Sequence, residues 1–187
     1  MRILFFCFLV MVSQTSYAND IAGVTVGDTL QMGDGTKLHL NGAGIRSKFF
    51  LDIYIAQLYM EHPAGSAEEV IASPGKKRMI MHFLYKEVTK DKLVSGWNEG
   101  FGNNLEPEHL AALKDRLDTF NTFFRTVKKG DIILLDYIPE QGTVVTISGQ
   151  EVGVIGGKDF NDALLGVWLG PKPINKGLKT KLLKPVQ

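Results

Sequence analysis

The sequence predicts an α+β domain in which a mainly antiparallel sheet is covered by helices. Strand-like segments come first, two amphipathic helical segments occupy the middle, and further strands precede a last helical region. This order differs from the regular alternation of a parallel α/β fold. The chain has 187 residues, of which 44% are hydrophobic, and contains no long Ser/Pro/Gly linker and no internal repeat. We therefore expect one domain with a single core, covering residues 19–187.

The first part of the domain is predicted to consist of strands. Short strands are predicted over residues 21–26, 29–32 and 36–40, with Gly33-Asp34-Gly35 as a turn. A longer strand, rich in β-branched and aromatic residues, follows from Phe49 to Met60. Its odd positions from Phe49 to Tyr59 are mostly apolar and predict the core face, and its even positions, which include Asp52 and Tyr54, are expected to face a cleft.

Helices dominate the middle of the chain. Ser66 and Glu69 form a capping box at the start of a short helix, and residues 79–85 then predict a strand. The basic run 76–78 before this strand is interpreted as a solvated strand entry. Thr89 caps a helix whose apolar face recurs every four residues, and Pro107 opens a second amphipathic helix closed by Lys128-Lys129-Gly130. The two apolar faces are Leu93, Trp97 and Phe101, and then Leu110, Leu113, Leu117, Phe120 and Phe124.

The C-terminal part predicts a hairpin followed by helices. Strands are expected over residues 131–138, 143–148 and 151–155, with a turn at Gly149-Gln150. Phe160, Leu164 and Trp168 define a helix face that Gly170-Pro171 ends, and residues 178–183 form a last short segment.

The N-terminus resembles a signal peptide. A positive start at Met1-Arg2 precedes an apolar run from Ile3 to Val12, and Ser16-Tyr17-Ala18 supplies small residues at the two positions that determine cleavage. The run is shorter than the roughly 20 residues that a membrane-spanning helix needs. We expect cleavage after Ala18 and a periplasmic or secreted protein without an integral membrane segment, a retained N-terminal anchor being the alternative.

Composition narrows the function classes. Cleavage would remove Cys7, the only cysteine, and with it any disulfide, cysteine nucleophile or thiolate metal site. It would also remove Arg2, leaving 20 basic residues (21 minus 1) against 20 acidic residues. The resulting net charge of zero disfavours a nucleic-acid partner. No metal site is expected, because the four histidines are scattered, and no cofactor, because phosphate-binding and dinucleotide-binding motifs do not occur. The histidines are His39, His62, His82 and His109.

Arg46 is the main candidate for a functional residue. It follows Gly42-x-Gly44, interpreted as a flexible element, and its planar set of donors would suit a carboxylate or phenolate. An ordinary ion pair with Asp52 is the alternative that the spacing alone favours. In an unbroken strand Arg46 and Tyr54 would lie about 26 Å apart, at roughly 3.3 Å per residue. They can share a ligand only if the chain turns, and Ser47-Lys48 is the predicted turn.

Two stretches resemble the chalcone isomerase-like superfamily, and its bacterial exported branch in particular. The first is Gly42-x-Gly44-x-Arg46 followed by the apolar strand that ends at Leu58-Tyr59. The second is Ala163-Leu164-Leu165-x-x-Trp168-Leu169-Gly170-x-x-Pro173. Together they bracket nearly the whole domain, and the resemblance implies an open-faced β-sandwich with helices.

The resemblance also implies roles for single residues. The matching arginine polarises the substrate in chalcone isomerases and holds the ligand carboxylate in fatty-acid-binding relatives. Tyr54 matches a tyrosine of those binders and a catalytic threonine of the plant enzymes. The plant enzymes' tyrosine and asparagine match Thr89 and Gly96, which cannot do the same chemistry, although Tyr85 and Asn98 lie close enough in sequence to replace them.

These residues support two main hypotheses. In the first, the protein is a non-catalytic binder of a small apolar carboxylic acid such as a fatty acid, held by Arg46 and Tyr54 with Tyr85 and Asn98 nearby. In the second, it is an intramolecular lyase of the chalcone isomerase type that acts on an unsaturated phenolic carbonyl compound. Arg46 would then be the catalytic residue that stabilises oxyanion charge. A third possibility is a structural module whose cleft has closed.

Overall fold

The fold is built on a seven-stranded sheet with the strand order β11-β10-β9-β6-β5-β4-β3, in which every neighbouring pair is antiparallel. A computed structural model describes residues 18–185, so all but the last residue of the predicted signal peptide lies outside the described residues. The sheet strands are β3 (Thr29–Gln31), β4 (Lys37–Lys48), β5 (Leu51–Met60), β6 (Lys77–Phe83), β9 (Ile132–Ile138), β10 (Gly142–Ile147) and β11 (Gln150–Ile155). Two small ribbons pair β1 (Ala18–Ile21) with β2 (Val24–Gly27) and β7 (Glu87–Val88) with β8 (Val127–Lys128).

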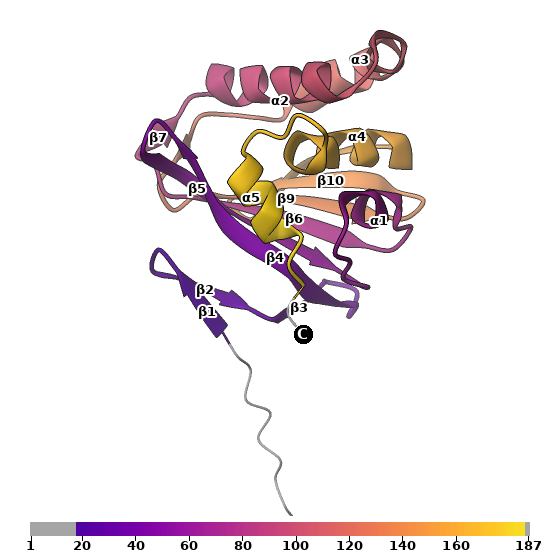
Figure 1. Cartoon of the computed structure of the whole chain (residues 1–187). Coiled ribbons are helices and arrows are strands. Elements are labelled where there is room, and N and C mark those ends of the chain that lie inside the picture. The colour runs from indigo at the N-terminus through magenta and orange to yellow at the C-terminus, as the bar shows by residue number, and fades with distance from the viewer. Residues whose placement is uncertain (1–17, 186–187) are drawn as a thin grey trace, which may run out of the picture.

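Within the described residues, five helices cover one face of this sheet, which confirms the predicted α+β class (Figure 1). Helix α4 lies between the sheet and the pair α2 and α3, α5 packs on β4, and the β1–β2 ribbon lies on the opposite side of the sheet. The helices are α1 (Ala67–Ala72), α2 (Lys90–Asn104), α3 (Pro107–Thr122), α4 (Lys158–Leu169) and α5 (Lys176–Leu182). In residues 18–185, no helix has the length and apolar character needed to cross a bilayer.

The helix boundaries follow from local chemistry. Ser66 and Glu69 make the predicted capping box on α1, and the Thr89 side chain accepts a hydrogen bond from the Lys92 amide at the start of α2. The prediction for the end of α3 was wrong, because the helix stops at Thr122 and the chain turns into β8 before Gly130. Gly130 instead adopts a positive φ in the turn between β8 and β9.

β5 is buried on both faces, which corrects the prediction that its odd positions form the core face. The even positions pack into the main core under the helices, whereas Tyr59 joins a smaller cluster with Val26 and Leu38 beneath the β1–β2 ribbon. A central strand covered on both sides lacks the simple alternation of a half-exposed strand. The even residues of the main core are Tyr54, Ala56, Leu58 and Met60.

The turn between β4 and β5 lies two residues later than predicted. Lys48 pairs with Leu51, so Phe49 and Phe50 are the two central residues of a tight hairpin and not the first residues of a strand. Both have positive φ, 49° and 67°, as in a type I′ turn. Phenylalanine favours strands, and the usual Asn-Gly or Asp-Gly signal is absent, which is why the sequence did not indicate this turn.

Gly42 and Gly44 are strand residues of β4 and not the flexible element that was predicted. Their missing side chains let α5 approach the strand: a Cβ at Gly42 would lie 2.2 Å from the Lys181 carbonyl oxygen. Asn41 stabilises this contact between α5 and β4, because its Nδ2 donates a hydrogen bond to the Leu182 carbonyl oxygen at 2.8 Å. The glycines therefore serve close packing next to Arg46.

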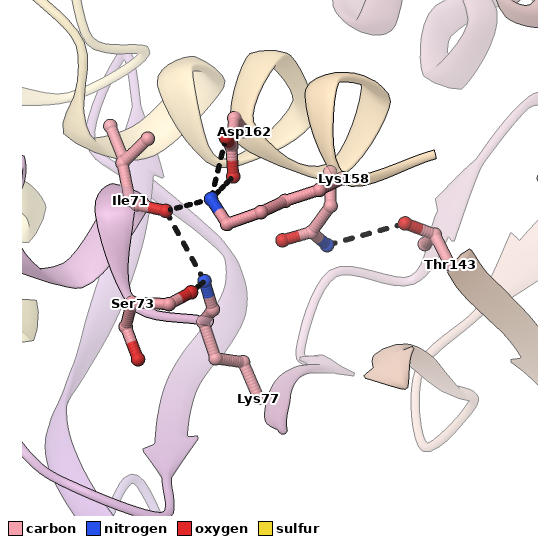
Figure 2. A network of polar contacts seen from close by, with 7 residues as sticks. Ile71, Ser73, Lys77, Thr143, Lys158 and Asp162 are labelled. Carbon is pink, nitrogen blue, oxygen red and sulfur yellow. Dashed lines mark hydrogen bonds and ion pairs between the residues drawn. The ribbon is translucent and has the colours of Figure 1, made fainter. Parts of the chain in front are cut away.

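The basic run at the start of β6 is not a solvated entry. Lys77 is 2% exposed, and its Nζ donates to the carbonyl oxygens of Ile71 and Ser73 at the end of α1, at 3.3 and 2.6 Å. Figure 2 shows Lys158 of α4 reaching the same Ile71 carbonyl while also pairing with Asp162. Burial and the nearby Lys158 charge lower the pKa of Lys77 to about 8. These lysines join α1, β6 and α4.

Candidate functional site

A cavity of about 760 Å³ opens between the β4–β5 end of the sheet, α2 and the segment 172–174. This size lies within the range of small-molecule sites, roughly 300–1,000 Å³. Its floor is apolar, and its rim carries exposed charges of both signs. The apolar floor consists of Ile53, Met81, Phe83, Leu93 and Trp97, and the exposed rim charges are Lys48, Lys92, Lys172, Glu87, Asp91 and Glu99.

Arg46 and Tyr54 meet in the wall of this cavity. They are cross-strand partners of β4 and β5, which is possible because the chain reverses at Phe49-Phe50. The guanidinium carbon of Arg46 lies 5.6 Å from the centre of the Tyr54 ring, a cation–π contact. The predicted separation of an unbroken strand therefore does not apply, and both side chains can reach one ligand.

Arg46 has an unsatisfied donor. Its Nε is buried and has no hydrogen-bond partner, and within residues 18–185 none of the ion pairs includes Arg46. Asp52, the partner that sequence spacing favoured, instead lies opposite Ser47 and accepts a hydrogen bond from its hydroxyl at 2.7 Å. A buried charged donor without a partner costs free energy, and an anion in the cavity would satisfy it.

The Tyr54 hydroxyl is oriented by a buried tryptophan. Trp168 Nε1 of α4 donates to the Tyr54 oxygen at 2.9 Å, and the Tyr54 side chain is 3% exposed. Burial raises the pKa of Tyr54, partly offset by the Arg46 charge and the Trp168 hydrogen bond. The phenol therefore stays protonated and keeps its own proton for donation to a ligand.

Trp97 is a further candidate that sequence reasoning interpreted only as a core residue. It lines the cavity from α2, and its Nε1 is buried without a hydrogen-bond partner. Buried indole N–H groups usually have a partner. Two residues that line one cavity, Arg46 and Trp97, thus each carry a buried donor without an acceptor. The helical spacing with Leu93 and Phe101 gave no signal for this role.

The remaining predicted residues divide between the cavity and the surface. Tyr85, just after β6, and Gly96 of α2 line the cavity. Asn98 lies on the exposed side of α2, where its Oδ1 accepts a hydrogen bond from Asn121 of α3 at 2.8 Å, so the structure does not bring it to Arg46. A residue directly after the inward-facing Trp97 is rotated by about 100° around the helix. Thr89 is engaged as the α2 cap.

The site is a set of donors beside an apolar surface. Arg46, Tyr54 and Trp97 supply N–H and O–H groups, and the floor supplies hydrophobic contacts. In the part of the chain that the structure describes, no three His, Cys, Asp or Glu residues are grouped as metal ligands would be. This arrangement can bind the anionic end of an apolar molecule, or stabilise negative charge on a bound oxygen.

Comparisons with known proteins identify the fold. Residues 18–184 match the family model described as chalcone isomerase-like. A crystal structure of a fatty-acid binding protein from Arabidopsis thaliana superposes with a TM-score of 0.67 at 18% identity, covering 90% of this chain and 95% of that chain. A comparison with curated protein sequences gave no match.

Proposed function

This chain belongs to the chalcone isomerase-like family, and we propose that it is an exported, non-catalytic protein whose cavity binds an apolar carboxylic acid, such as a fatty acid. The single observation that carries the proposal is Arg46. Its Nε is buried in the cavity wall and lacks an acceptor among the described residues. A ligand carboxylate would supply that acceptor through a charge-assisted hydrogen bond.

The proposed pose follows from the positions of the donors. The carboxylate lies against Arg46, and the Tyr54 hydroxyl donates a second hydrogen bond, since Trp168 already occupies a lone pair of its oxygen. The apolar chain then extends over the floor formed by Ile53 and Phe83. Burial of that chain contributes roughly 0.8 kcal/mol per CH₂ group, so affinity should increase with chain length until the cavity is full.

The structural neighbour supports this ligand class. That protein is described as a fatty-acid binding protein, and its fold covers nearly all of the present chain. The identity of 18% transfers the fold and not the ligand. The carboxylate ligand is therefore our proposal, and it is supported by the unsatisfied donors of Arg46 and Trp97.

Native mass spectrometry with lipid extraction tests the proposal directly. The protein is purified from the periplasm as wild type, Arg46→Ala and Lys172→Ala, and the intact mass also tests cleavage after Ala18. Lys172 lines the same cavity from an exposed position, so its replacement removes a rim charge and leaves Arg46 unchanged. We expect a carboxylic acid with wild type and Lys172→Ala that is lost in Arg46→Ala.

Titration with a fluorescent fatty acid measures how much Arg46 contributes to the binding affinity. A hydrogen bond to a charged group contributes about 1.5–3 kcal/mol, so Arg46→Ala should weaken binding roughly 10- to 150-fold. Arg46→Lys should recover part of this loss, because it keeps the charge without the planar fork. Equal affinity in wild type and Arg46→Ala would refute the proposal. Turnover of a chalcone-like compound by pure wild type, lost in Arg46→Ala, would establish the isomerase alternative instead.

A further inference from the structure

The hairpin between β4 and β5 exposes an unusual apolar tip, here defined as Lys48–Leu51. Phe49 is 83% exposed, Phe50 is 103% exposed and Leu51 is 48% exposed. Among residues 18–185 only one other large hydrophobic side chain, Val154, is classed as exposed. Scattered exposed hydrophobic residues are normal, whereas three in succession on one protruding turn indicate a contact surface.

The fold itself gives no reason for these residues. Both phenylalanines occupy positive φ, where a side chain with a Cβ is strained and where Asn or Gly is preferred. Their side chains are largely exposed, so packing offsets little of this strain. Phe49 makes a cation–π contact with Lys48, whose Nζ lies 5.8 Å from the centre of the ring.

The tip also borders the ligand cavity. Lys48, Phe49 and Leu51 line the same cavity as Arg46. From these observations we propose that the tip inserts into the headgroup region of a lipid bilayer and brings the cavity mouth to the membrane surface. Aromatic side chains beside a lysine suit this interface, where rings enter the acyl boundary and ammonium groups meet anionic lipids.

The area of the tip favours a bilayer over a protein partner or a second copy of this chain. Two phenylalanines and part of a leucine offer on the order of 400–500 Å². A stable protein interface needs about 800 Å² from each partner. Insertion into lipid has no such threshold, because its free energy scales with the apolar area that leaves water.

The charges around the mouth predict only moderate dependence on anionic lipid. Lys48 is the basic residue of the tip, and Lys92 and Lys172 lie on the rim, but three exposed acidic residues line the same rim. Basic residues are attracted to an anionic membrane, and the acidic residues of the rim offset this attraction. The aromatic rings therefore supply most of the binding. The link between membrane contact and ligand uptake rests on the proposed function, whereas insertion of the tip does not.

Vesicle flotation tests the proposal with one designed variant. Phe49→Asn combined with Phe50→Gly removes both rings and supplies the preferred residues of this turn, so the hairpin is retained. We expect wild type to float with vesicles of phosphatidylglycerol and phosphatidylethanolamine, and the double variant to partition at least roughly tenfold less. Val154→Ser, which removes an exposed apolar residue of β11, should bind like wild type.

A second variant reports insertion directly. In Phe50→Trp, the new indole should emit at long wavelength in buffer and at shorter wavelength with vesicles, whereas the native Trp97 and Trp168 are already buried. Absence of both flotation and the spectral shift would overturn the proposal, and so would a wild-type dimer that the double variant abolishes. Arg46→Ala should float like wild type, so loss of ligand and loss of membrane binding are separate results.

Discussion

Replacing the aromatic turn should make the isolated protein more stable. In the variant Phe49→Asn with Phe50→Gly, the two positive φ angles of 49° and 67° would be held by residues that tolerate them. Left-handed backbone costs a residue with a side chain roughly 1–2 kcal/mol. Both rings are largely exposed, at 83% and 103%, so the folded state loses little packing.

The expected net effect is a gain of about 1–2 kcal/mol. The strain relief of roughly 2 kcal/mol is reduced by about 0.5 kcal/mol for the lost cation–π contact with Lys48. For a domain of this size, such a gain raises Tm by about 2–8 °C. Urea denaturation of wild type and the double variant, without lipid or ligand, measures it.

The matched control is Phe49→Ala with Phe50→Ala. It removes the same rings but keeps side chains at both positive φ positions, so its stability should stay near that of wild type. A double variant with Asn and Gly that is less stable than wild type would refute the reasoning. That result would show that the rings contribute to the folded state through contacts within the chain.

Three further perturbations follow from the structure. The pKa of Lys77 in the folded state is about 8, below its ordinary value of 10.5. Between these two pH values the folded state therefore holds fewer protons than the unfolded state. The free energy of unfolding should then increase as the pH rises from 8 to 10.5. The expected increase, measured by urea denaturation at several pH values, is on the order of 2–3 kcal/mol, and Lys77→Met should remove it. The same pH dependence of stability in wild type and Lys77→Met would contradict the lowered pKa of Lys77. Gly42→Ala should cost at least about 2 kcal/mol because its Cβ would collide with the Lys181 carbonyl, whereas Gly33→Ala, where a Cβ meets nothing within 4 Å, should be nearly neutral by thermal melting. Tyr54→Phe should lose about 1–3 kcal/mol of stability, since it leaves a buried indole N–H without its acceptor, and should also weaken fatty-acid binding; unchanged values in both assays would exclude its proposed role.

The sequence predicted the parts of the fold that depend on local chemistry. The capping box at Ser66, the Thr89 cap and the α4 face through Trp168 are all present, because caps and helical periodicity act over a few residues. The family resemblance is confirmed by the match over residues 18–184. It also indicated Arg46 and Tyr54 before their contact across two strands was known.

The remaining features depend on tertiary contacts that a single sequence does not display. Gly42 and Gly44 looked flexible because the helix that packs on them lies more than 130 residues later. The Phe49-Phe50 turn violates the local preferences on which turn prediction depends. The unsatisfied donor of Trp97 also has no sequence signal, because an apolar helix face predicts the same residue for packing alone.

The packing of α5 against β4 ties the ligand site to a distant part of the sequence. β4 carries Arg46 and pairs with β3 and β5, and the same strand also packs against Leu178, Lys181 and Leu182 of α5. None of these three residues lines the cavity. A substitution that displaces α5 should therefore shift the strand that carries Arg46 and alter the site without changing any residue of its lining.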